Sequence, residues 1–201
     1  MKPAHLFQVC RRPAGVTVLL ALAAWCCAGC FTMVPQFQEA PLTSTPQPLK
    51  VVLLLDSAWS SAQYVGGPFG EKHTYLLGDS LVKYATSAAQ KSFQEVVVIH
   101  GDTPGATVAG TTAVLRPALA RVQTVESATT TGGQKAILLV DWTITSPTDN
   151  RVLWKNSIDA EGDDRNGHGS IRDRGREAFE DAFDQLYIKT VASLSSAKLS
   201  R

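Results

Sequence analysis

The chain has 201 residues, enough for one folded domain beside targeting segments but short for two. Hydrophobic residues make up 44% and charged residues 18%, a balance that is typical of a globular protein and excludes an intrinsically disordered one. Three of the 19 basic side chains lie in the first 30 residues, whereas every acid follows them, so the rest of the chain is slightly negative. This charge disfavours nucleic acid as a partner, because proteins that bind it present a clustered basic face.

Residues 1–29 have the organisation of a bacterial signal peptide. A basic segment that ends at Arg12 is followed by an apolar run from Ala14 to Trp25, which has the length expected of a signal-peptide core. A transmembrane helix needs about 20 apolar residues, and this run is shorter. The pattern therefore favours a cleaved leader over the alternative of an uncleaved membrane anchor.

The leader ends in Ala28-Gly29-Cys30, which resembles the lipobox of bacterial lipoproteins. Cys27 stands three positions before the cut, where that family usually has Leu or another aliphatic residue. The resemblance implies that the signal peptide is removed and that Cys30 becomes the lipidated N-terminus, whose acyl chains together anchor the protein to a membrane. Phe31 follows, and in enterobacteria the usual inner-membrane retention signal is Asp at that position, so the resemblance implies transfer to the outer membrane.

All the cysteines lie in this first part of the chain. They are Cys10, Cys26, Cys27 and Cys30. A secreted domain held by disulfides has cysteines throughout its body. No disulfide is therefore expected in the folded part.

Residues 30–48 are predicted to be the lipidated cysteine and a tether. Four prolines among Gln, Thr and Ser predict a segment that stays extended and solvated and holds the domain away from the bilayer. A single globular domain, residues 49–201, is expected to follow.

Hydrophobic periodicity predicts seven elements in that domain. In chain order they are a buried strand at 49–56, a helix at 79–93, a strand at 95–99, a strand that begins after Pro117 and ends at 125, the strongest strand at 135–146, its hairpin partner at 151–159, and an amphipathic helix at 171–195. Residues 57–72 read as a loop. This order predicts an α+β fold, a mostly antiparallel sheet of four to five strands with two helices packed on one face.

Gly78-Asp79-Ser80-Leu81 matches the short signature of the GDSL esterases and lipases, in which the serine is the nucleophile. That family supplies its base from an Asp-x-x-His motif near the C-terminus, whereas here Arg165 stands three residues before His168. A serine without a positioned base is a weak nucleophile. We therefore assign no catalytic residue and expect Asp79 or Ser80 to cap a helix; a hydrolase that uses Ser80 is kept as an alternative.

The stretch Glu161–Gly169 is the most polar of the domain, and its acids could chelate a divalent cation. It matches only a fragment of a calcium-binding loop, so it is read as a flexible connection before the last helix. His73 and His100 have no metal-binding residue at ligand spacing. No metal site and no cofactor are predicted.

Aromatic residues in the predicted loop are the candidate contacts with a partner, because aromatic side chains are enriched at the centres of interfaces. They are Trp59, Tyr64 and Phe69. Trp142 and Trp154 alternate with aliphatic residues in predicted strands and are expected in the core.

The lipobox, the proline segment and the element order together resemble the small accessory lipoproteins of the Gram-negative envelope. Among these are the lipopolysaccharide-assembly lipoprotein and the auxiliary lipoproteins of lipid-transport ABC systems. The resemblance implies a non-enzymatic binding or assembly module, lipid-anchored at the periplasmic face of the outer membrane and bound to an envelope protein. The alternatives are the anchored esterase and a carrier of a lipid or small ligand in a pocket between sheet and helices.

Overall fold

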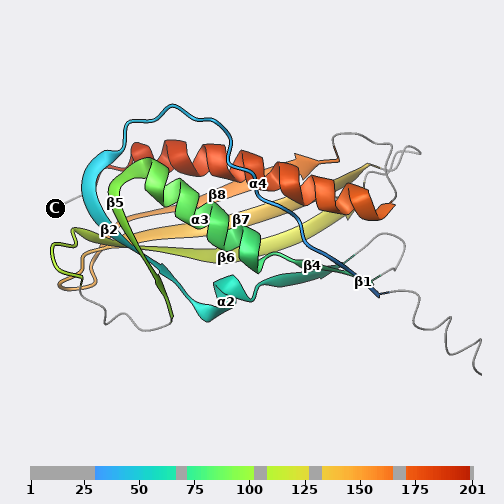
Figure 1. Cartoon of the computed structure of the whole chain (residues 1–201), viewed down its shortest axis with the longest axis horizontal. Coiled ribbons are helices and arrows are strands. Elements are labelled where there is room, and N and C mark those ends of the chain that lie inside the picture. The colour runs from blue at the N-terminus through green and yellow to red at the C-terminus, as the bar shows by residue number, and fades with distance from the viewer. Residues whose placement is uncertain (1–29, 67–71, 102–107, 127–132, 165–170, 200–201) are drawn as a thin grey trace, which may run out of the picture.

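The structure is a computed structural model that describes residues 30–66, 72–101, 108–126, 133–164 and 171–199 (Figure 1). The predicted signal peptide, Phe69 and His168 lie outside the described residues.

The larger of two sheets has five strands in the order β5-β2-β6-β7-β8. They are β2 (Gln47–Leu55), β5 (Phe93–His100), β6 (Ala113–Glu126), β7 (Gln134–Thr145) and β8 (Val152–Asp163). Two long helices, α3 (Gly78–Ser92) and α4 (Ile171–Ser195), pack on one face of this sheet (Figure 1). The predicted α+β fold is confirmed, and all seven predicted elements are present.

The five-stranded sheet is mixed. β2 runs parallel to both of its neighbours, β5 and β6, whereas β6, β7 and β8 form an antiparallel meander. β2 and β5 are parallel because α3 lies between them in the chain. This helix returns the chain to the end of the sheet at which β2 begins, as a parallel crossover requires.

A smaller sheet has three strands in the order β1-β4-β3. Its strands are β1 (Cys30–Met33), β3 (Gln63–Gly66) and β4 (Lys72–Leu76), and a short helix, α2 (Ser57–Ser60), precedes β3. The prediction of a loop at 57–72 is therefore wrong for most of that stretch. Strands of four and five residues next to several glycines are too short to give a clear alternation in the sequence.

β6 begins at Ala113, so the prediction that this strand starts after Pro117 is also wrong. Its pairing with β2 is confined to Ala113–Leu115, and Pro117 is paired with Trp142 of β7. Pro117 is tolerated because it lies beyond the end of the β2 ladder, where β6 is an edge strand on that side.

The core fills the space between the larger sheet and the two helices. Every second residue of β7 is fully buried on the helical face, namely Ala136, Leu138, Val140, Trp142 and Ile144. Trp142 is thus confirmed as a core residue, and Trp154 is half-buried and packs against the core. The helix and sheet approach so closely that a Cβ on Gly162 of β8 would lie 2.1 Å from the backbone nitrogen of Ala182 in α4.

The segment that joins the two sheets, residues 34–46, runs along the two helices and is called the N-terminal strap (Figure 1). Pro35 and Phe37 are buried, whereas Val34 and Gln36 are exposed. The prediction of a solvated tether is therefore wrong here. The prolines keep the strap extended, but its alternate apolar side chains insert between the helices.

Candidate functional site

Phe37 anchors the strap in the seam between α3 and α4. Its ring centroid lies 6.2 Å from that of Tyr84 in α3 and 5.4 Å from that of Tyr187 in α4. Aromatic rings at these separations attract one another beyond the gain from burial alone. The strap is thus a structural part of the domain.

Polar contacts hold the strap to both helices on either side of Phe37. The Ser80 hydroxyl in α3 donates to the carbonyl oxygen of Pro35 at 2.6 Å, and the backbone N–H of Gln36 donates to Glu180 of α4 at 3.1 Å. The Tyr187 hydroxyl donates to Glu39 at 3.1 Å. These bonds attach the strap to α3 and α4 and not to the sheet.

The next residues of the chain complete the ends of both helices. The Ser44 hydroxyl donates to the carbonyl of Lys91 near the end of α3, at 2.9 Å. The Gln47 side-chain amide donates to the carbonyls of Leu194, Ser195 and Ala197, at 2.8, 3.1 and 3.2 Å. The last carbonyls of a helix have no partner within it, so these contacts satisfy acceptors that otherwise need water.

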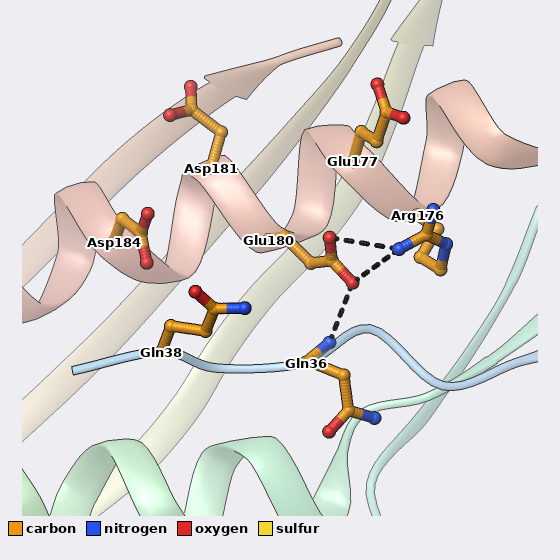
Figure 2. Close-up of a pocket in the computed structure, with 7 residues that line it drawn as sticks. All are labelled: Gln36, Gln38, Arg176, Glu177, Glu180, Asp181 and Asp184. Atoms are coloured by element: carbon orange, nitrogen blue, oxygen red, sulfur yellow. Dashed lines mark hydrogen bonds and ion pairs between the residues drawn. The ribbon is translucent and has the colours of Figure 1, made fainter. Parts of the chain in front are cut away.

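A groove of about 260 Å³ lies between the strap and α4, and we call it the strap groove (Figure 2). It is lined by Gln36, Gln38, Arg176, Glu177, Glu180, Asp181 and Asp184. Four carboxylates against one guanidinium make its lining negative. Small-molecule sites usually exceed about 300 Å³ and are mostly apolar, so this groove better suits a basic polypeptide segment than an apolar ligand.

Charged side chains in the groove contact one another and the neighbouring sheet. Arg176 donates to both carboxylate oxygens of Glu180, at 2.9 and 3.1 Å, and Asp181 accepts the backbone N–H of Asp163 at 3.1 Å. Figure 2 shows Asp184 and Gln38 on opposite sides of the groove, and Glu177 pointing away from the strap. The arrangement offers several hydrogen-bond acceptors in a row along one helix face.

The space in which a ligand carrier would hold its cargo, between the sheet and the helices, is filled by aromatic side chains. Trp142, Phe179 and Phe183 are all fully buried there. The geometry thus gives no support to the carrier alternative at this position.

The predicted aromatic contact residues lie in different surroundings. Trp59 is only 2% exposed and belongs to the core, so the expectation of an exposed contact is wrong for it. Its burial follows from α2, which Asp56 caps by accepting the backbone N–H of Trp59 at 2.7 Å. Tyr64 is half-buried, with its hydroxyl 3.0 Å from that of Thr124. Phe69 lies outside the described residues.

Ser80 lies in the first turn of α3, is 2% exposed and is covered by the strap. The helix begins at Gly78 with Leu77 at the N-cap position, and no side chain caps it. The expectation that Asp79 or Ser80 caps this helix is therefore wrong. Asp79 still stabilises the helix, since a negative charge in the first turn favours the helix dipole.

The two histidines considered in the sequence analysis have different surroundings. His73 is fully buried between the rings of Phe31 and Tyr75, and His100 is exposed at the end of β5. No group of three or more His, Cys, Asp or Glu side chains within the described ranges is arranged to hold a metal ion.

The polar stretch that begins at Glu161 starts as strand and not as loop. Glu161 and Asp163 belong to β8, and both contact the Lys135 ammonium. Asp164 lies 3.8 Å from Arg174 at the start of α4. Residues 165–169 lie outside the described residues, so the reading as a flexible connection is wrong only for the first three positions.

No protein-family model matches the sequence, and no curated protein matches it. The fold resembles the crystal structure of XCC0632 from Xanthomonas campestris, of family DUF330, with a TM-score of 0.55 and 12% identity over 80% of this chain and 91% of that one. A PelC dodecamer from Paraburkholderia phytofirmans gives a TM-score of 0.43 and 15% identity over 79% and 95% of the two chains. A minor lipoprotein from Acinetobacter baumannii gives 0.42 and 13% over 77% and 96%. The Xanthomonas likeness shows a shared fold.

Among the described helices, none combines the length and the apolar composition needed to span a bilayer.

Proposed function

We propose that this protein is an envelope lipoprotein, anchored by acyl chains on Cys30 to the periplasmic face of the outer membrane, and that its domain is a non-enzymatic docking module. The observation that carries the proposal is the position of Cys30. It ends a signal-peptide pattern and is also the first residue of β1. In this proposal the acylated residue is itself part of a strand of the domain.

The packed strap supports this proposal, but it places the domain closer to the anchor than a solvated tether would. Because residues 30–33 lie in a sheet and Phe37 lies in the core, no solvated tether separates the anchor from the domain. A domain held directly at the bilayer has its orientation fixed by its first strand. That arrangement suits a module that presents one surface to a partner in the same membrane.

The strap groove is the surface that we assign to the partner. Its row of acids would accept hydrogen bonds from a basic segment of an envelope protein and attract its positive charge. Complementary charge raises the rate of association and disfavours wrong partners. Non-enzymatic action fits the burial of Ser80, whose hydroxyl bonds to a backbone carbonyl.

The anchor is tested by membrane fractionation of cells that express variants of the full chain. We expect Cys30→Ala to leave the membrane fraction or to keep its leader uncleaved, whereas Cys26→Ala, a matched change outside the lipobox, leaves anchoring unchanged. Equal membrane recovery of processed protein from both variants would exclude Cys30 as the anchor.

The docking surface is tested by capture of the tagged protein from detergent-solubilised membranes, with mass spectrometry of what is retained. We expect the double variant Glu177→Lys and Asp184→Lys to lose a stoichiometric envelope protein that the wild type retains. Asp159→Lys, which reverses an exposed acid on β8, is the control and keeps the partner. If the wild type, the double variant and Asp159→Lys all retain the partner, the partner does not bind at the groove.

A further inference from the structure

The smaller sheet has two faces of different character. Side chains alternate along a strand, and paired residues share a face. One face carries Met33, His73 and Tyr75, which are buried against the core. The other face, which we call the outer face, carries Thr32 of β1, Lys72 and Thr74 of β4, and Val65 of β3.

Exposed apolar side chains gather on and next to this outer face. In the described ranges, five large hydrophobic residues are exposed: Val34, Val65, Leu76, Val152 and Ile188. The first three lie on the smaller sheet or directly after β1. Val34 and Leu76 line the same hollow, of about 200 Å³. Single exposed hydrophobics are common, but two on a sheet of 13 residues and a third directly after its first strand form a patch.

The patch lies on the same face of the smaller sheet as the position of the anchor. Cys30 is paired with Lys72, so the outer face begins at the residue that the proposed function acylates. Strands advance about 3.3 Å per residue and lie about 4.8 Å apart, which places Val34 and Val65 within about 13 Å of Cys30 along the backbone framework.

We propose that the outer face of the smaller sheet rests on the lipid bilayer, with Val34, Val65 and Leu76 at the level of the headgroups. The proposal rests on the proposed function, because it requires acyl chains on Cys30. Chains that enter the bilayer from the first residue of β1 hold this sheet at the membrane surface, and no flexible segment lets it leave. Exposed Lys72 beside the anchor attracts anionic headgroups.

The orientation leaves the strap groove free for a partner. The buried face of the smaller sheet packs on α4 through Tyr75 and Phe179, whose ring centroids are 4.8 Å apart. Residues two positions apart on a helix point in nearly opposite directions, so Glu177 and Asp181 project away from Phe179 and from the bilayer.

Single-cysteine labelling tests this placement. Once the leader is removed, Cys30 is the only native cysteine, and acylation blocks its thiol. Val65→Cys and Val152→Cys are matched sites, 55% and 54% exposed, on the smaller sheet and at the start of β8. Each acylated variant is labelled with a polarity-sensitive fluorophore and reconstituted into vesicles of phosphatidylethanolamine and phosphatidylglycerol.

On reconstitution, we expect the label at position 65 to shift its emission to the blue and to become severalfold less accessible to iodide in the buffer. The label at position 152 should not change. Leu76→Cys repeats the test if Val65→Cys does not fold. If the protein floats with the vesicles but both labels stay equally accessible, the inference is wrong and the proposed function still stands.

The other outcomes separate the inference from the proposed function. Processed protein that is not acylated and does not float with the vesicles overturns the proposed function and the inference with it. A label at position 65 that becomes shielded only when envelope proteins are added overturns the inference, because a protein and not lipid then covers the outer face.

Discussion

Phe37 and Tyr187 lie with their ring centroids 5.4 Å apart, and this contact closes the N-terminal strap over α4. The two residues come from opposite ends of the chain. Their contact makes the strap part of the core, so the strap and the two helices form one packed unit. The stability of the domain should therefore depend on the strap.

Phe37→Ala should lower the free energy of unfolding by about 3 kcal/mol, the lower end of the usual cost of removing a buried phenyl ring. Its ring is 9% exposed and packs on both helices. Urea denaturation of the purified domain measures the change. Gln38→Ala, on the exposed side of the strap, should stay within about 0.5 kcal/mol of the wild type. Equal stability of the two variants would mean that the strap is not packed in solution.

Ser80→Ala should cost about 1 kcal/mol, because it removes a buried hydrogen bond to Pro35 and leaves that carbonyl without this donor. The same variant decides between the docking module and the esterase. We expect neither wild type nor variant to hydrolyse a short acyl ester above the rate in buffer. Hydrolysis by the wild type that disappears in Ser80→Ala would support the esterase instead.

Gly162→Ala should lower the free energy of unfolding by about 2 kcal/mol or more, since overpacking of a tight contact costs about 1–3 kcal/mol. The added methyl group would meet the Ala182 nitrogen at 2.1 Å and the Ala178 carbonyl at 2.3 Å, which are backbone atoms. Calorimetry of the variant measures the loss. Asp159→Ala, at an exposed position of the same strand, should leave the melting temperature nearly unchanged. A thermally wild-type Gly162→Ala would contradict the close helix–sheet packing.

Stability should fall at alkaline pH. Burial first, and then the hydrogen bond to Glu39 and its negative charge, raise the pKa of Tyr187 from 10.0 to about 12. A tyrosine with a raised folded-state pKa contributes stability that is complete below pH 10 and is lost as the pH rises towards 12. Burial and the charge of Tyr64 raise the pKa of Tyr75 to about 12 as well.

Urea denaturation on either side of pH 10 measures this dependence. Tyr187→Phe should show a shallower fall in the free energy of unfolding above pH 10 than the wild type, because the substituted residue has no proton to release. Identical slopes for the two proteins would assign the alkaline loss to other groups.

Much of the fold was predictable because its elements are long and periodic. The alternation of β7 and the apolar stripe of α4 each extend over several repeats, so position and type were both evident. The pairing of strands that are distant in the sequence was predicted less well. The order of strand 49–56, helix 79–93 and strand 95–99 did carry a signal for a parallel pair, which the expectation of a mostly antiparallel sheet did not use.

The strap was missed because its prolines suggested a solvated linker. A signal was nevertheless present, since apolar Pro35 and Phe37 alternate with polar Gln36 and Gln38 in the pattern of a half-buried extended segment. The partner of that pattern is the seam between two helices that lie far along the chain, and local sequence does not reveal it. Trp59 was misplaced for the same reason, because α2 folds it inward.

The central claim is that Cys30 is the lipidated first residue of a domain without a tether. Mass spectrometry of the N-terminal tryptic peptide of the mature membrane protein tests it most directly. We predict a peptide that runs from Cys30 to Lys50 and carries a diacylglyceryl group and an amide-linked acyl chain, with no peptide from residues 1–29. An unmodified Cys30, or a mature chain that retains its leader, would contradict the account.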